Sequence, residues 1–266
     1  MKKICKSIEP QELSQYRNSH PHDNWNKFRG SRGKRRYKAV ANKLKSDQGG
    51  ICAYCEIDLK IRNTTAGRDD FRVEHFIPKS KTTPQHNYHL DWSNLLGVCH
   101  GGSESLVVDA TDRFTAPDLH CDAYKDQDKT IDRSQDILNP LSVPAFPPLF
   151  TFSRNVDTSK NGIMSVIPDN CTISGISVEK AKKTIDYLNL NHQQLKKARG
   201  KILNTLNADL RAERAKGIEL KAALQKMCKI YLSKKADGTW SPFFSTIRAY
   251  LGSEAEEYLK QTNYNG

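Results

Sequence analysis

Apolar residues recur at helical spacing at both ends of the chain. Near the N-terminus, Tyr37, Val40, Ala41 and Leu44 fall on one face of a basic segment, and a double glycine at 49–50 follows as a stop signal. A shorter helical piece precedes it, from residue 10. The helical pattern returns at about residue 177, where Ser177 or Ser174 can cap a helix, and continues in three segments to residue 235. Two short closing helices follow at 241–252 and 253–262, and Ser253 is placed to cap the second.

The middle of the chain has a different pattern. Residues 51–135 show little long periodicity and several turn signals. Four prolines between residues 140 and 148 exclude a helix there. Two apolar runs, 149–155 and 162–168, then flank a turn sequence and predict a β-hairpin. We therefore expect an α+β protein, mostly helical, with three parts: a basic helical arm at 1–50, a small site-bearing core at 51–135, and a hairpin plus helices at 136–266.

One short extended segment carries unusual chemistry for a strand. Glu74 and His75 stand side by side just before Pro78. Neighbouring side chains on a strand point to opposite faces, so at least one of the pair must face inward or both must line an open site. Imidazole accepts a proton near neutral pH, and a carboxylate offers a hard oxygen ligand for a metal. This pair is a candidate for catalysis.

The charge of the chain is uneven. The net charge is +12, with 13 Lys/Arg against 4 Asp/Glu in residues 1–50 and 15 against 5 in residues 179–235. Residues 51–178 carry 12 against 17 and are slightly acidic. Two basic flanks around an acidic middle suit a polyanion such as nucleic acid, although solvated helix faces are an alternative. No apolar run is long enough for a membrane span and no secretory signal is present, so we expect a cytoplasmic protein.

The cysteines predict a structural zinc site. The count is seven, which argues against a disulfide framework, and Cys52 and Cys55 form a C-x-x-C pair after the double glycine. Two thiolates at this spacing can bind one Zn²⁺, and Cys99 and Cys121 are the natural second pair. His100 and His120 are adjacent alternatives for a ligand position. A loop-rich module with little core gains most from such a metal.

Four motifs together resemble the HNH endonuclease family. Members of that family contain, in this order along the chain, a C-x-x-C pair, an acidic residue followed by His on a strand, and an Asn before a second cysteine pair. A final His, Asn or Asp stands where a helix begins. The matching residues here are Cys52-x-x-Cys55, Glu74-His75-x-x-Pro78, Asn94-Leu95 with Cys99, and Cys121-Asp122-x-x-Lys125. One feature departs from the pattern, because 21 residues separate Cys99 from Cys121. The fourth zinc ligand and the last HNH position are therefore the least secure. We take Asp122 for the last HNH position, with His100 and His120 as the alternatives.

The resemblance implies a fold and a set of roles. The fold is a ββα-metal finger with a structural zinc, embedded in the mostly helical protein. His75 takes a proton from water, while Glu74 and Asp122 hold a catalytic Mg²⁺ or Mn²⁺. Asn94 braces the loop and orients His75, although a turn-forming Asn is the plainer interpretation. Outside these residues, we interpret His86 and His89 as loop groups and Trp92 as a packing anchor. Lys79, Lys81 and Lys125 are either phosphate contacts or ordinary surface lysines.

A wider match, including "ILNPL" and "IDYLNLNHQQLKKARG", resembles the PtuB-type nucleases of Septu and retron-associated anti-phage systems. The resemblance implies a metal-dependent endonuclease, acting on DNA or RNA, that works in antiviral defence. It also implies a PtuA-type ATPase partner, for which the helical C-terminal half is a plausible docking surface, and in retrons a reverse transcriptase with its RNA–DNA hybrid. The alternative is a non-catalytic zinc-finger nucleic-acid binder or an adaptor subunit of the ATPase complex.

Overall fold

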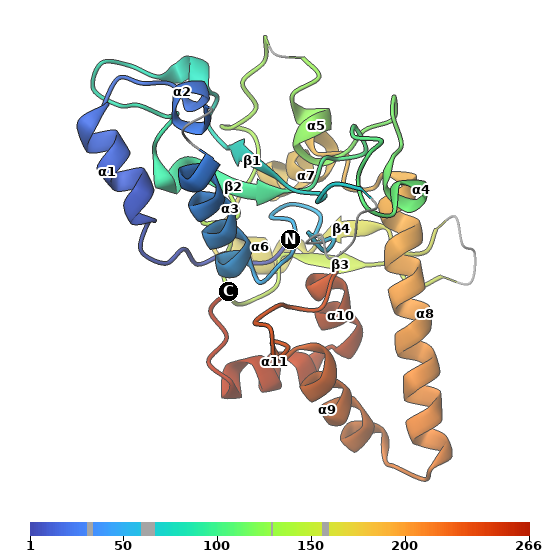
Figure 1. Ribbon diagram of the computed structural model, residues 1–266. Helices are drawn as coiled ribbons and strands as arrows, with labels where there is room; N and C mark the ends of the chain where they lie inside the picture. Colours follow the sequence, from blue (N-terminus) through green and yellow to red (C-terminus); the bar gives the residue numbers. More distant parts are fainter. Residues whose placement is uncertain (31–33, 60–66, 129, 156–159) are drawn as a thin grey trace.

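The computed structural model describes residues 1–30, 34–59, 67–128, 130–155 and 160–266. It is mostly helical with two small antiparallel sheets, which agrees with the α+β class (Figure 1). The predicted hairpin is present, although residues 156–159 of its turn lie outside the described residues. The division into parts at residues 50 and 135 stays a prediction.

The N-terminal arm consists of three helices, α1 (Gln11–Ser19), α2 (Trp25–Arg29) and α3 (Lys34–Gln48). Helix α3 buries Val40, Ala41 and Leu44 as its pattern predicts. The short α2 was not predicted, and it begins where the Asn24 side chain accepts a hydrogen bond from the Lys27 N–H.

The core of the candidate site is a hairpin followed by a helix, β1 (Arg72–His75), β2 (Leu95–Val98) and α5 (Cys121–Lys125). The strands pair antiparallel, with Glu74 opposite Leu96 and His75 opposite Leu95. The Gln48 side-chain amide ties α3 to this hairpin, because it donates to the Gly97 carbonyl at 2.7 Å and accepts from the Gly97 N–H at 2.7 Å. A Cβ at Gly97 would meet the Phe71 ring, so this position needs glycine.

The segment between Cys99 and Cys121 folds back on itself. It contains the one-turn helix α4 (Ala110–Arg113), and its two ends meet where the His120 N–H donates to the Gly101 carbonyl at 3.0 Å. Gly101 has φ +61° and lies so close to His120 that a Cβ would clash. The long insertion therefore leaves the two cysteines side by side.

The C-terminal half begins with an irregular proline-rich segment and the hairpin of β3 (Phe150–Phe152) and β4 (Met164–Val166). Its helices are α6 (Pro168–Ile173), α7 (Val178–Tyr187), α8 (Gln193–Ala215), α9 (Leu220–Tyr231), α10 (Phe244–Leu251) and α11 (Ser253–Gln261). Ser177 caps α7 as predicted, by accepting from the Lys180 N–H. The cap predicted at Ser253 is wrong, because Ser253 is already helical and Gly252 holds the cap position.

Two apolar clusters hold these parts together. One joins α3, the β1–β2 hairpin, the β3–β4 hairpin and α7, while the other joins the far part of α8 to α9, α10 and α11. Figure 1 shows α8 starting beside α4 and running away from the β1–β2 hairpin. Among the described residues, no helix combines the length and apolar character that crossing a membrane requires.

Candidate active site and metal centre

The four predicted cysteines come together from three separate segments. Cys52 and Cys55 lie in a tight turn closed by the Cys52 N–H on the Ile57 carbonyl, Cys99 follows β2, and Cys121 begins α5. Their sulfur atoms all lie within 4.8 Å of one another. The Cys99 N–H also points at the Cys52 sulfur, at 3.4 Å, as is common for amides around metal-bound thiolates.

The sulfur spacing fits one tetrahedral ion. Four sulfurs at ~2.3 Å from a common Zn²⁺ lie ~3.8 Å apart, and the Cys99 sulfur lies 3.7 Å from those of Cys55 and Cys121. Burial raises the pKa of the Cys121 thiol, so a dication is needed to keep this thiolate set charged. These cysteines can hold one zinc ion.

The two histidines kept as alternative zinc ligands lie outside the set of sulfurs. His120 is buried with its Nδ1 3.2 Å from the Cys121 sulfur, beside the cluster rather than in it. His100 is engaged through its backbone N–H, which donates to Asp70 at 2.6 Å. Neither supplies a ligand atom to the cysteine group found among the described residues.

Three carboxylates of the hairpin–helix unit form a second group of possible ligands. Glu74 from β1 meets Asp122 and Asp126 from α5, with one oxygen of each within 4.8 Å of the others. Glu74 and Asp122 are buried, while Asp126 is exposed. The set offers hard oxygen donors, the ligands that Mg²⁺ and Mn²⁺ prefer. Sequence reasoning paired Glu74 with Asp122 but missed Asp126.

Two cations from the chain itself lie against these carboxylates. Lys125 Nζ is 2.5 Å from Glu74 and 3.1 Å from Asp126, and the Arg72 guanidinium contacts Asp122 at 2.5 and 3.0 Å. Burial and the neighbouring Asp122 raise the pKa of Glu74, so this carboxyl needs a cation beside it to stay ionised. Lys125 is therefore a buried part of the site and not an ordinary surface lysine.

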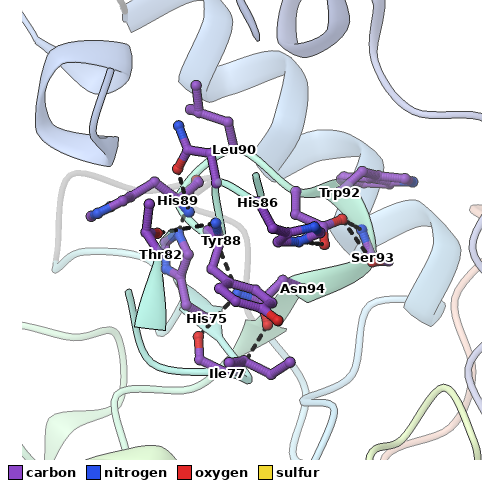
Figure 2. Close-up of polar contacts among 12 residues, drawn as sticks. His75, Ile77, Thr82, His86, Tyr88, His89, Leu90, Trp92, Ser93 and Asn94 are labelled. Carbon is purple, nitrogen blue, oxygen red and sulfur yellow. Dashed lines mark hydrogen bonds and ion pairs between the residues drawn. The ribbon is translucent and has the colours of Figure 1, made fainter. Parts of the chain in front are cut away.

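His75 points away from the carboxylates. Its ring is buried, and its Nε2 lies 3.2 Å from the His89 backbone carbonyl (Figure 2). The Trp25 ring packs edge-on against it, with the two ring centroids 4.9 Å apart. Because a carbonyl only accepts, Nε2 carries the proton and Nδ1 is left as the acceptor. Burial, with help from Lys79, lowers the pKa of His75 to about 3, so the imidazole is neutral at physiological pH.

Asn94 holds the loop that joins β1 to β2. Its Oδ1 accepts from the Ile77 N–H at 2.7 Å, and its Nδ2 donates to the carbonyls of Ile77 and Tyr88, both at 3.0 Å (Figure 2). Tyr88 directly precedes His89, whose carbonyl holds the His75 ring. Asn94 is thus linked to His75 through one loop.

The remaining predicted loop residues take plain positions. His86 is exposed and pairs with Asp91 at 2.8 Å, while Trp92 is buried and lies under the Lys6 ammonium at 3.9 Å. Lys79 is exposed, and so is Lys81, which lies 3.7 Å from Asp132.

Two site residues that sequence reasoning missed follow simple spacing rules. Arg72 stands two positions before Glu74 on the same strand, so both side chains leave the same face. Asp126 stands four positions after Asp122, at the end of the same short helix, where residues share a face. Trp25 is a third residue that was missed. No sequence signal indicates it, because its contact with His75 depends on the packing of α2.

Comparison with known proteins identifies the family. No protein-family model matches the chain. An Escherichia coli protein named "Retron Ec83 putative HNH endonuclease" is 36% identical over 224 residues, which cover 78% of this chain and 81% of that protein. The chain belongs to the HNH endonuclease family. The two ligand groups described above, one of sulfur and one of oxygen, are thus found in a chain of that family.

Proposed function

We propose that the protein is a metal-dependent HNH endonuclease that hydrolyses phosphodiester bonds of nucleic acid, with DNA favoured over RNA. The observation that carries the proposal is the division of β1: neutral His75 on one face and Glu74, with its partner carboxylates, on the other. The order β1, β2, α5 supports a ββα-metal finger. The four cysteines would hold a structural Zn²⁺ that fixes this unit.

His75 supplies the base. Its Nε2–H is fixed on the His89 carbonyl, which leaves Nδ1 free to take a proton from the attacking water. A nearby phosphate would raise the low pKa of His75 toward the useful range, because negative charge favours the imidazolium. Asn94 acts through the loop by holding the segment that positions His89.

Glu74 and Asp122, together with Asp126, would hold the divalent ion. When bound, Mg²⁺ or Mn²⁺ supplies charge relief to the phosphate and stabilises the leaving oxygen. Lys125 and Arg72 place positive charge at the same carboxylates, Lys125 against Glu74 and Arg72 against Asp122.

The family relationship supports a defence context. The relative is named as a retron protein, and we propose the same setting here, with the nuclease as the effector of an anti-phage complex. A PtuA-type ATPase, as in Septu systems, would dock on residues 136–266, and a reverse transcriptase with its RNA–DNA hybrid would join it in a retron.

A second candidate is a non-catalytic zinc-finger nucleic-acid binder or adaptor of the ATPase complex. Two observations favour it: His75 is 6% exposed and packs against Trp25, and the carboxylates already have cation partners. For this candidate, the pair Glu74–His75 would serve packing alone.

The test is cleavage of supercoiled plasmid and of RNA with Mg²⁺ or Mn²⁺, by the chain alone and co-expressed with the ATPase. We expect His75→Ala to lose about 100-fold or more in rate with unchanged zinc content. Equal cleavage by His75→Ala and the parent would remove His75 from catalysis. No cleavage in any form, with zinc bound, would favour the non-catalytic candidate.

A further inference from the structure

Helix α8 presents a basic stripe to the solvent. Every third or fourth residue from 197 to 215 is exposed, and the stripe consists of Lys197, Lys201, Asn204, Ala208, Arg211 and Ala215. The opposite side of the helix buries Leu195, Leu203 and Leu206. The stripe is thus a solvent-facing surface and not the packing face of α8.

Acidic groups of α8 and α9 do not neutralise the stripe. Residues 193–235 contain twelve Lys/Arg against three Asp/Glu. Asp209 accepts from the Tyr231 hydroxyl, and Glu213 pairs with Lys216 and Lys226 at 2.8 and 2.9 Å. The third acid, Glu219, is exposed and 3.9 Å from Arg214.

Within the part of the chain that the structure describes, one ion pair reaches the stripe. Lys201 lies 3.7 Å from Asp112 of α4, and both side chains are about 60% exposed, so that this pair is weak. Lys197 and Arg211 have no ion-pair partner among the described residues, so their charges are available to a ligand.

The length and composition of the stripe fit a phosphate backbone. From Lys197 to Arg211 the helix rises ~21 Å, the axial length of about six phosphates along one strand of a duplex. Asn204 adds an amide donor, and Ala208 and Ala215 allow close approach of the helix. We propose that this Lys197–Ala215 stripe binds the backbone of a nucleic-acid duplex at a second site, away from the carboxylates of α5.

An acidic protein surface is a poorer match. Protein interfaces centre on large apolar or aromatic anchors, and the stripe has none. The exposed apolar residues of this region, Leu220 and Ile230, lie on α9. The stripe therefore suits a polyanion held by charge, while other surfaces of the C-terminal half remain for the ATPase.

The test measures duplex affinity in the full-length protein without added Mg²⁺ or Mn²⁺. The triple variant K197E/K201E/R211E is compared with K221E/K229E/K235E, which changes the net charge equally on another face. We expect the stripe variant to bind a duplex of about 30 base pairs at least ~10-fold more weakly. The slope of log affinity against log salt concentration, measured between about 50 and 200 mM salt, should be smaller by the amount expected for about three phosphate contacts. The control should change less than about threefold. Equal losses in both variants, or no loss in the stripe variant, would overturn the proposal.

The inference rests on the proposed function, in which nucleic acid is the substrate. The experiments below distinguish a failure of the stripe proposal from a failure of the proposed nuclease function. His75→Ala should keep duplex affinity while it loses cleavage, and the stripe variant should keep the rate on saturating short substrate while its KM rises. Loss of ATPase binding with intact duplex affinity would assign the stripe to a protein partner and overturn the proposal.

Discussion

The ammonium of Lys125 lies 2.5 Å from the carboxylate of Glu74, and both side chains are about 5% exposed. The same ammonium lies 3.1 Å from Asp126, so it sits among the oxygens proposed to hold a divalent ion. Burial and the neighbouring Asp122 raise the pKa of Glu74, and the ammonium of Lys125 opposes that rise by favouring the ionised carboxylate.

Lys125→Met should destabilise the metal-free protein and make it more responsive to metal. Removing one partner of a buried ion pair costs about 3–5 kcal/mol, because the other charge is left alone. Without the ammonium, Mn²⁺ has sole access to the three carboxylates, so the ion should restore more stability to the variant than to the parent. Urea unfolding with and without Mn²⁺ measures both effects.

Lys79→Met is the matched control, because Lys79 is exposed on the adjoining loop. It should change stability by less than about 0.5 kcal/mol. If Mn²⁺ stabilises Lys125→Met no more than the parent, Lys125 does not compete for the ion's position. If Mn²⁺ stabilises neither protein, the carboxylates do not bind it.

The cysteine cluster should hold one zinc ion per chain and depend on Cys121. Cys121→Ser should lose the zinc and lower the melting temperature by about 10 °C, because the metal joins three segments that are far apart in the sequence. His120→Ala should keep the zinc, since His120 lies beside Cys121 and outside the sulfur set. Metal content by elemental analysis and thermal unfolding measure the outcome.

Cys5→Ser is the control for this series, because Cys5 is exposed and far from the cluster in sequence. It should leave both zinc content and melting temperature unchanged. Retention of zinc by Cys121→Ser together with its loss from His120→Ala would exchange the roles of the two residues.

Much of the helical architecture could be predicted because periodicity reports burial locally. The face of α3 at Val40, Ala41 and Leu44, the Ser177 cap and the β3–β4 hairpin all follow from spacing within one element. The five-residue α2 could not be predicted in this way, since it has too few residues to show a period.

In the candidate site, too, the sequence motif predicted some residues, while others depend on tertiary contacts that a motif does not show. The motif placed Glu74 and Asp122, and the structure brings them together. It could not indicate that Lys125 turns inward, because a lysine on a short helix is usually exposed and its burial depends on the partner strand. The insertion after Cys99 likewise made Cys121 the least secure of the predicted zinc ligands. The contact at Gly101 that closes this insertion is tertiary and cannot be read from the sequence.

Asn94→Ala should release the loop between β1 and β2. Three backbone groups of Ile77 and Tyr88 would lose their partner inside the protein, at a cost of about 2–3 kcal/mol in unfolding free energy. Cleavage should fall while duplex affinity stays, because the loop positions His75 rather than the substrate. Asn42→Ala, on the exposed side of α3, should have neither effect. A cleavage rate equal to that of the parent would make Asn94 structural only.

The buried neutral His75 should make the protein less stable as the pH falls. Its pKa is about 3 when folded and 6.5 when exposed, so between these values the unfolded chain binds a proton that the folded chain does not. The stabilisation is complete above pH 6.5 and is lost as the pH falls toward 3. From pH 6.5 to 5.5 the parent should lose about 1 kcal/mol more unfolding free energy than His75→Gln. Urea unfolding of both proteins at each pH measures this difference. The thiols and the other histidines are present in both proteins, so their contributions to the pH dependence cancel. Identical pH profiles would mean that His75 has the same pKa in the folded and unfolded chains, so that folding does not hold the ring as a buried neutral imidazole.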